Sequence, residues 1–171
     1  DVSLVGSEMC IRDSPKIEAV SCWDFYQDPN ATSIEDCNYV IQRHKITASD
    51  MRDLLNRPFF RESAIRNCLE SGPNYEARSY ETALYDRENQ ADYEQDRFEV
   101  FEYWGKMDKN LAEEAGLDID PDEVDILDEV DINAWVCNGH ILRLVLNPFT
   151  PSRLPYICLL YTSDAADEKR C

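Results

Sequence analysis

The sequence is poor in the features that mark several common functional classes of protein. Its 171 residues include only five glycines and two histidines, so it has neither the glycine-rich loop that cradles phosphate groups nor a histidine-rich metal site. No apolar run approaches the roughly 20 residues that a membrane-spanning helix needs. Lysine and arginine total 17 against 35 aspartates and glutamates. The resulting net charge of −18 disfavours a module that grips DNA phosphates.

The cysteines between residues 15 and 157 are too widely spaced for a CxxC zinc site or for a dense disulfide framework. They are Cys22, Cys37, Cys68 and Cys137. We expect reduced thiols that pack as small hydrophobic side chains.

The two ends of the chain are related at the DNA level. Glu8–Ser14 (EMCIRDS) and Cys158–Ser163 (CLLYTS) can be back-translated into strings that are reverse complements over nearly their whole length. The methionine in the first string has a single codon, which leaves little freedom to force such a match. Both ends resemble translated transposase adapters of sequencing libraries. We therefore expect residues 1–14 and 158–171 to be adapter-derived scars, and residues 15–157 to be a partial protein of one domain or less.

The first half of the chain predicts two strands followed by two helices. The strands are expected at 16–29 and 38–46, separated by an acidic turn, and the helices at 48–56 and 61–71. Thr47 is placed to cap the first helix, which Pro58 ends. The second helix carries Ile65, Cys68 and Leu69 on one face, and Gly72-Pro73 supplies its stop signal.

A polar stretch then separates this half from the next ordered segment. Residues 74–96 carry no apolar periodicity and predict a flexible, solvated loop. Aromatic residues fall on both faces of 97–108 (RFEVFEYWGKMD), which predicts a strand covered on two sides. A short helix is expected over 109–117, ending at Gly116.

The strongest local signal is a β-hairpin around Asn138-Gly139, because a type I′ turn needs positive φ at both central residues. A regular register predicts the pairs Cys137–His140, Trp135–Leu142 and Asn133–Leu144 on one side, and Val136–Ile141 and Ile132–Val145 on the other. The proline-rich stretch 147–156 is then expected to leave the sheet as an extended connector. Together these elements predict an α+β fold of antiparallel β-hairpins with short helices.

An acidic stretch before the hairpin partly matches a calcium-binding EF-hand loop. Asp118, Asp120, Asp122 and Glu129 occupy positions 1, 3, 5 and 12 of that pattern. The sixth position, which needs glycine, is Glu123, Pro121 stiffens the loop, and the following element is a predicted strand. An acidic solvated turn is therefore the preferred interpretation, and an acidic calcium-binding module remains an alternative.

Residues for catalysis are not evident. His44 and His140 lack the sequence context of a metalloprotease helix or a catalytic triad, so we expect structural roles for both. Asn30-Ala31-Thr32 matches the pattern of a glycosylation sequon, but we expect no glycosylation there, because nothing in the sequence argues for secretion. We predict no catalytic, cofactor-binding or metal-binding residue, no cofactor and no enzymatic activity.

Two stretches in collinear order carry a family likeness. Residues 23–54 (WDFYQDPNATSIEDCNYVIQRHKITASDMRDL) contain an aromatic-Asp-Pro segment, an Ile-Glu-Asp turn and a Tyr-Val-Ile strand ending in Arg-His. Residues 98–108 and 131–156 contain a Glu-Tyr-Trp-Gly strand, the Asn-Gly hairpin and an Asn-Pro-Phe-Thr-Pro run. In this order the motifs resemble portal proteins of tailed bacteriophages, particularly the podovirus type.

The resemblance implies a structural virion protein rather than an enzyme. Portal proteins form a homo-oligomeric ring, typically a dodecamer, that is the head-tail connector at one capsid vertex. Terminase packages double-stranded DNA through the ring without sequence-specific binding, the genome is ejected through it, and capsid and tail proteins attach to it. Residues 15–157 would belong to the wing-like region, in the virion and, during assembly, in the bacterial host cytoplasm. A fragment of a phage hydrolase remains a further alternative.

Overall fold

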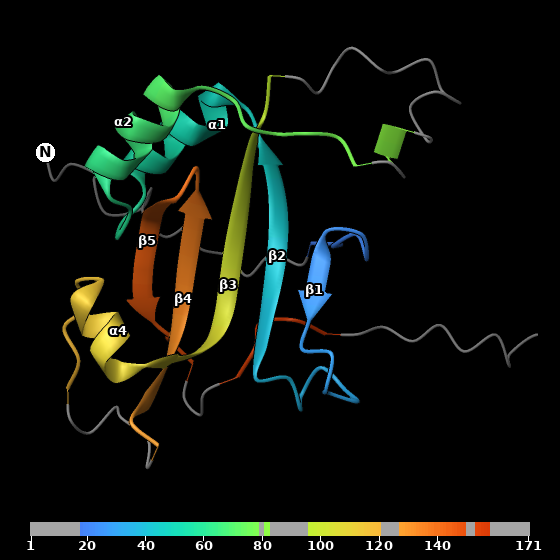
Figure 1. Cartoon of the computed structure of the whole chain (residues 1–171), viewed down its shortest axis with the longest axis vertical. Coiled ribbons are helices and arrows are strands. Elements are labelled where there is room, and N and C mark those ends of the chain that lie inside the picture. The colour runs from blue at the N-terminus through green and yellow to red at the C-terminus, as the bar shows by residue number, and fades with distance from the viewer. Residues whose placement is uncertain (1–17, 79–80, 83–95, 121–126, 150–152, 158–171) are drawn as a thin grey trace, which may run out of the picture.

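The computed structural model describes residues 18–78, 81–82, 96–120, 127–149 and 153–157. They form a five-stranded antiparallel sheet in which each strand pairs with the next along the chain (Figure 1). The strands are β1 (Phe25–Gln27), β2 (Tyr39–Ile46), β3 (Phe98–Asp108), β4 (Glu129–Cys137) and β5 (His140–Leu146). The helices are α1 (Ala48–Asp53), the 3-10 turn η1 (Leu54–Asn56), α2 (Glu62–Ser71) and α4 (Lys109–Glu114). The predicted α+β fold is confirmed.

The helices begin and end where the sequence predicts, within one or two residues. Thr47 and Asp50 form a reciprocal capping box: the Thr47 side chain accepts from the Asp50 N–H, and the Asp50 carboxylate accepts from the Thr47 N–H at 3.0 Å. The last turn of the predicted first helix tightens into η1. In α2, Ile65 and Cys68 are fully buried and Gly72 ends the helix with φ +83°.

The predicted first strand is shorter than expected. Of residues 16–29, only β1 is extended and paired, and the chain turns before it, where the Asp24 N–H donates to the Ser21 carbonyl at 3.0 Å. β1 is an edge strand that pairs over three residues with β2. Asp28 ends it as predicted: its carboxylate accepts from the Asn30 N–H and the Asn38 side chain, both at 2.9 Å.

The two faces of the sheet are covered differently. On one, here called the helical face, Phe98 and Val100 are buried under α1 and α2. On the other, here called the open face, Val130 and Ile132 pack against α4. Within the described residues, the predicted cover of 97–108 on both sides is therefore incomplete, because none of them covers the centre of the open face, where Phe101 is only half-buried.

The segment 147–157, here called the strap, does not leave the sheet as predicted. Phe149 lies 6.0 Å from the Trp104 ring, and Tyr156 lies 4.9 Å from the Phe25 ring. The Tyr156 hydroxyl also donates to the Gln42 side chain at 2.9 Å. The described parts of the strap therefore cover the end of the helical face that α1 and α2 leave exposed.

The hairpin turn is confirmed, but its register is only partly as predicted. Asn138 and Gly139 have φ +50° and +74°, and the pairs Cys137–His140 and Val136–Ile141 form. A β-bulge then shifts the pairing, so that the observed pairs are Trp135–Arg143, Asn133–Val145 and Ile132–Leu146. The predicted pairs Trp135–Leu142, Asn133–Leu144 and Ile132–Val145 are wrong.

The bulge has a tertiary cause. Leu142, the extra residue, is fully buried on the helical face, and its carbonyl accepts from the Arg61 N–H at 2.7 Å. Beyond it the alternation of β5 is reversed, so Leu144 packs in the cluster under α4. A regular register would place Leu144 on the opposite face.

We expect Gly139→Val to lower the free energy of unfolding by at least about 1 kcal/mol, because a β-branched residue resists the φ of +74° at this position. Chemical denaturation measures the change. His140→Val is the matched control, since the next residue lies in a strand, where valine is favoured. Equal stability of the two variants would contradict the assigned turn.

Candidate functional site

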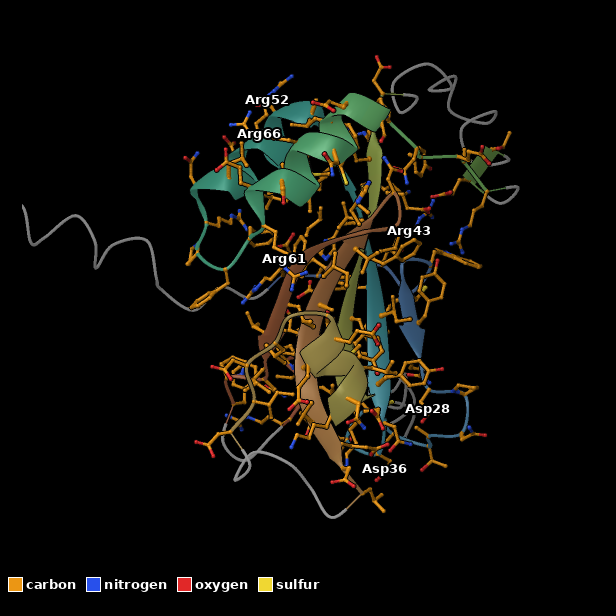
Figure 2. All side chains as sticks on the ribbon, turned by 60° about the vertical axis from the view of Figure 1, so that its left-hand side comes forward. Asp28, Asp36, Arg43, Arg52, Arg61 and Arg66 are labelled. Carbon is orange, nitrogen blue, oxygen red and sulfur yellow. The ribbon has the colours of Figure 1, made fainter. Side chains whose placement is uncertain are left out.

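The most concentrated group of charges surrounds Arg43 on the open face. Its side chain is fully buried, and its Nε lies 2.6 Å from Glu99 Oε1. Its Nη1 lies 3.2 Å from Glu81 Oε1 and 3.4 Å from Asp24 Oδ1. The guanidinium also stands 5.0 Å from the centre of the Tyr75 ring. Figure 2 shows Arg43 projecting from the sheet, away from the arginines of the helical layer.

The electrostatics of this cluster keep Glu81 and Arg43 charged. Burial alone would raise the pKa of Glu81, but the Arg78 N–H, Lys45 and Arg43 lower that pKa to about 2. Burial likewise opposes the charge of Arg43, yet Glu81 and Glu99 raise its pKa above the ordinary value. Groups whose pKa values lie this far from 7 keep one protonation state near neutral pH. The cluster around Arg43 therefore acts as an ionic lock. It joins β1, β2 and β3 to the segment that follows α2.

A second polar group, here called the polar belt, crosses the helical face and consists of Gln42, His44, Glu102 and Asn133. Glu102 is its centre: His44 Nε2 lies 2.8 Å from Oε2, and the Asn133 amide donates to Oε1 at 3.1 Å. The Trp104 indole N–H also donates to Oε1, at 2.8 Å. Burial tends to raise the pKa of Glu102, but these partners, His44 first, lower it overall. His44 thus has the structural partner that we predicted.

The cysteines in the described part of the chain are free thiols, as predicted. Cys68 Sγ donates to the Cys137 carbonyl at 3.2 Å, and both residues are buried. Burial, with Cys68 beside it, raises the pKa of the Cys137 thiol to about 12, and burial also raises the pKa of Cys68. Both are therefore protonated at neutral pH and are poor nucleophiles.

The remaining predicted candidates lie apart from these groups. His140 follows the hairpin turn opposite Cys137. Asn30 lies exposed in the turn after β1.

The stretch that partly matches a calcium loop lies partly outside the described residues, since these exclude 121–126. Asp118 and Asp120 are exposed, and Glu129 lies 3.6 Å from Lys106 Nζ at the start of β4. Within the ranges that the structure describes, no group of three or more His, Cys, Asp or Glu side chains could hold a metal ion. In the same ranges, no helix is both long and apolar enough to cross a membrane.

The surface of the described residues includes two hollows of several hundred Å³. One, of about 730 Å³, lies under the strap and is lined by Cys37, Asp131, Phe149 and Tyr156 among others. The other, here called the trough, has a volume of about 490 Å³ on the open face. Its floor and rim are almost wholly apolar: Tyr26, Ile41, Arg78, Phe101, Tyr103, Met107, Ala134 and Val136.

The ionic lock, the polar belt and the trough were not predicted from the sequence. One signal for the first two was available in β2 (YVIQRHKI), where Gln42 and His44 alternate with Arg43 and Lys45. Polar residues on both faces of a central strand indicate that each face buries polar partners. These partners lie 19 to 114 positions away in the chain, so they are not visible locally.

One comparison with known proteins supports the resemblance to portal proteins. A family model described as phage SU10 portal protein matches residues 5–115, well over half of the chain. The match includes β1, β2, β3 and the helices between and after them. It begins inside the segment 1–14 that we predict to be adapter-derived. A search of curated proteins finds no match. By the extent of the family match, the chain belongs to the phage SU10 portal protein family.

Proposed function

We propose that this chain is part of a portal subunit and builds the wing-like outer region of a homo-oligomeric ring at one capsid vertex. The observation that carries the proposal is the family match over residues 5–115, which spans three of the five strands. In this proposal the ring is of the podovirus type, typically a dodecamer, and terminase, capsid and tail proteins contact it. Its place is the virion and, during assembly, the host cytoplasm.

A rigid and acidic domain suits a passive role beside moving DNA. The ionic lock around Arg43 and the antiparallel sheet hold the described part of the domain in a fixed shape. The net charge of −18 disfavours retention of DNA, because attraction to phosphates would slow its passage. Figure 2 shows Asp28 and Asp36 at one end of the molecule and Arg52 and Arg66 on the helical layer at the other. The function proposed is thus assembly and conduction rather than chemistry.

Expression of the complete gene that contains this sequence tests the proposal. Electron microscopy of the product should show closed rings, with the domain formed by residues 18–157 at their periphery. A product that stays monomeric at all concentrations, or whose image places this domain on the ring axis, would contradict the proposed role.

We expect the chain of 171 residues alone to be monomeric or weakly associating, and not to bind duplex DNA measurably at physiological salt. The physical reason is the excess of acidic residues, which repel both phosphates and other copies. Light scattering across a salt series and a duplex-binding titration measure the two parts. Tight DNA binding that weakens with salt would indicate a nucleic-acid enzyme instead.

We also propose that residues 1–14 and 158–171 contribute nothing to the fold. Removing both segments should leave the melting temperature unchanged, because adapter-derived residues were never selected to pack. A longer deletion, of residues 1–14 and 153–171, is the control. It also removes Tyr156 and its bond to Gln42, and should lower the melting temperature. A loss of several degrees in the shorter deletion would contradict the adapter origin and favour the family match from residue 5.

A further inference from the structure

The buried side of α2 and the end of β4 hold two cysteines against each other. Cys68 lies on the buried face of α2, and Cys137 is the last residue of β4. The Cys68 thiol donates to the Cys137 carbonyl with 3.2 Å between sulfur and oxygen, and both side chains are buried. Burial has the largest influence on the pKa of each thiol, and the other thiol has the next largest. The two sulfurs are therefore immediate neighbours, although they lie 69 positions apart in the chain.

Further bonds hold together the two elements that carry these sulfurs. The Asn138 side-chain amide donates to the Gly72 carbonyl at 3.1 Å, which ties the hairpin turn to the residue that ends α2. The Cys137 thiol also lies 3.9 Å from Asn74 Oδ1. Figure 1 shows α2 beside the end of the sheet at which β4 turns into β5. Because both backbones are already held here, joining the sulfurs requires mainly a rotation of the two side chains.

We propose that Cys68 and Cys137 are a site of covalent modification, at which a disulfide forms when the chain meets a small-molecule disulfide as oxidant. One protein thiol loses its proton, and its thiolate attacks a sulfur of the oxidant and releases one small thiolate. The second protein thiol loses its proton and attacks the protein sulfur of this mixed disulfide, which releases the other small thiolate. The released thiolates take up the two protons. The cysteine pair is thus oxidised by two electrons, and the oxidant is reduced to two thiols.

Burial makes this pair slow to oxidise. An oxidant reaches either sulfur only when α2 lifts locally from the sheet, and thiols with raised pKa values supply little thiolate. In the setting of the proposed function, the pair stays reduced in the host during assembly and becomes linked in the released particle, where it fastens the helical layer to the sheet. That setting rests on the proposed function, whereas the disulfide itself rests on the contact between the two thiols.

Oxidation of the full chain by glutathione disulfide tests the site. The reaction is run in urea below the unfolding transition, which favours local opening, and peptide mapping by mass spectrometry identifies the products. We expect a peptide pair linked through Cys68 and Cys137, from a band that stays monomeric on a non-reducing gel. Cys22 is exposed and should form a mixed disulfide with glutathione, which shows that the reagent is active. Free thiols at both buried positions after Cys22 is fully modified, or links from them to other cysteines only, would overturn the inference.

The melting temperature gives a second, independent readout. A link across 69 positions restricts the unfolded chain, so oxidation should raise the melting temperature by about 5 °C or more. Cys68→Ala and Cys137→Ala should each abolish this rise, whatever their own stability when reduced. Cys22→Ala is the control and should keep it. A melting temperature that falls once Cys68 and Cys137 are linked would show that the fold does not accommodate the disulfide, and would overturn the site.

Failure of this site and failure of the proposed portal function are distinguishable. Closed rings from the complete gene, with Cys68 and Cys137 still free after oxidation, would overturn the disulfide alone. A linked pair in a product that stays monomeric at all concentrations would contradict the portal role and leave the disulfide standing.

Discussion

Replacing Arg43 with methionine should lower the free energy of unfolding by about 3 to 5 kcal/mol. The guanidinium is fully buried and contacts Glu81, Glu99 and Asp24, of which Glu81 is almost completely buried. Without the arginine, these carboxylates repel one another in a site of low dielectric constant, and Glu81 keeps the Lys45 ammonium and the Arg78 N–H as partners. Urea denaturation followed by circular dichroism measures the loss.

A surface arginine that also forms an ion pair serves as the control, because it separates the effect of burial on stability from the effect of charge. Arg66 pairs with Glu62 one helical turn away, but the two side chains are 63% and 67% exposed. Arg66→Met should therefore change stability by less than about 1 kcal/mol. Adding Glu81→Gln to Arg43→Met should recover part of the loss, because it removes one unpaired charge. Equal effects of the two arginine replacements would show that the cluster is not buried as described.

The same cluster sets an expected response to acid. The pKa of Glu81 falls from its ordinary 4.5 to about 2 in the folded chain. A carboxyl group with a depressed folded pKa contributes stability that is present above the unfolded pKa and is lost as pH falls through the folded value. Stability should thus decline between about pH 4.5 and pH 2, and Glu81→Gln should flatten that part of the profile.

Gly105→Ala should be the second severe substitution, with a loss of about 3 kcal/mol or more. A Cβ at this position would stand 2.6 Å from both the Asn38 carbonyl oxygen and Tyr39 Cβ. These atoms belong to the adjacent strand, at the start of β2, where Tyr39 pairs directly with Gly105. The clash involves backbone that no side-chain rotation can relieve, so β2 and β3 would have to separate locally.

Gly72→Ala is the control for the glycine effect. Gly72 also has positive φ, +83°, but nothing lies within 4 Å of a Cβ added there. Gly72→Ala should therefore lower the free energy of unfolding by only about 1 kcal/mol, because alanine resists positive φ. Thermal unfolding of both variants measures the difference. If Gly105→Ala were no less stable than Gly72→Ala, the close approach of β2 to β3 would be wrong.

Features that depend on neighbouring residues were predictable from the sequence. The Thr47 cap, the buried side of α2 and the Asn138-Gly139 turn each depend on a few adjacent positions, and each is confirmed. The bulge in β5 was not predictable, because it depends on the contact between Leu142 and Arg61, which lies far away in the chain. The prediction that residues 147–156 leave the sheet was wrong for a similar reason. Prolines predict an extended chain but not the direction in which it runs.

The family could be predicted from the sequence, but the trough on the open face could not. The collinear motifs resembled portal proteins, and the family match supports that relationship. The trough was missed because aromatics on both faces of 97–108 predicted full cover. In the structure, α4 covers the open face only toward one end of β3, and Phe101 and Tyr103 remain half-buried beyond it. Cover by a helix depends on where the chain turns back, which hydropathy alone does not specify.

The polar belt divides the apolar packing of the helical face into two units that can lose structure separately. On one side, Phe98 and Val100 pack under the helices, and on the other, Val40 and Trp104 pack under the strap, in distinct clusters. Few apolar contacts couple units separated in this way, so each has its own threshold for local opening. Release of the strap would bare Trp104 to solvent while the amides of the helical layer stayed protected from hydrogen exchange.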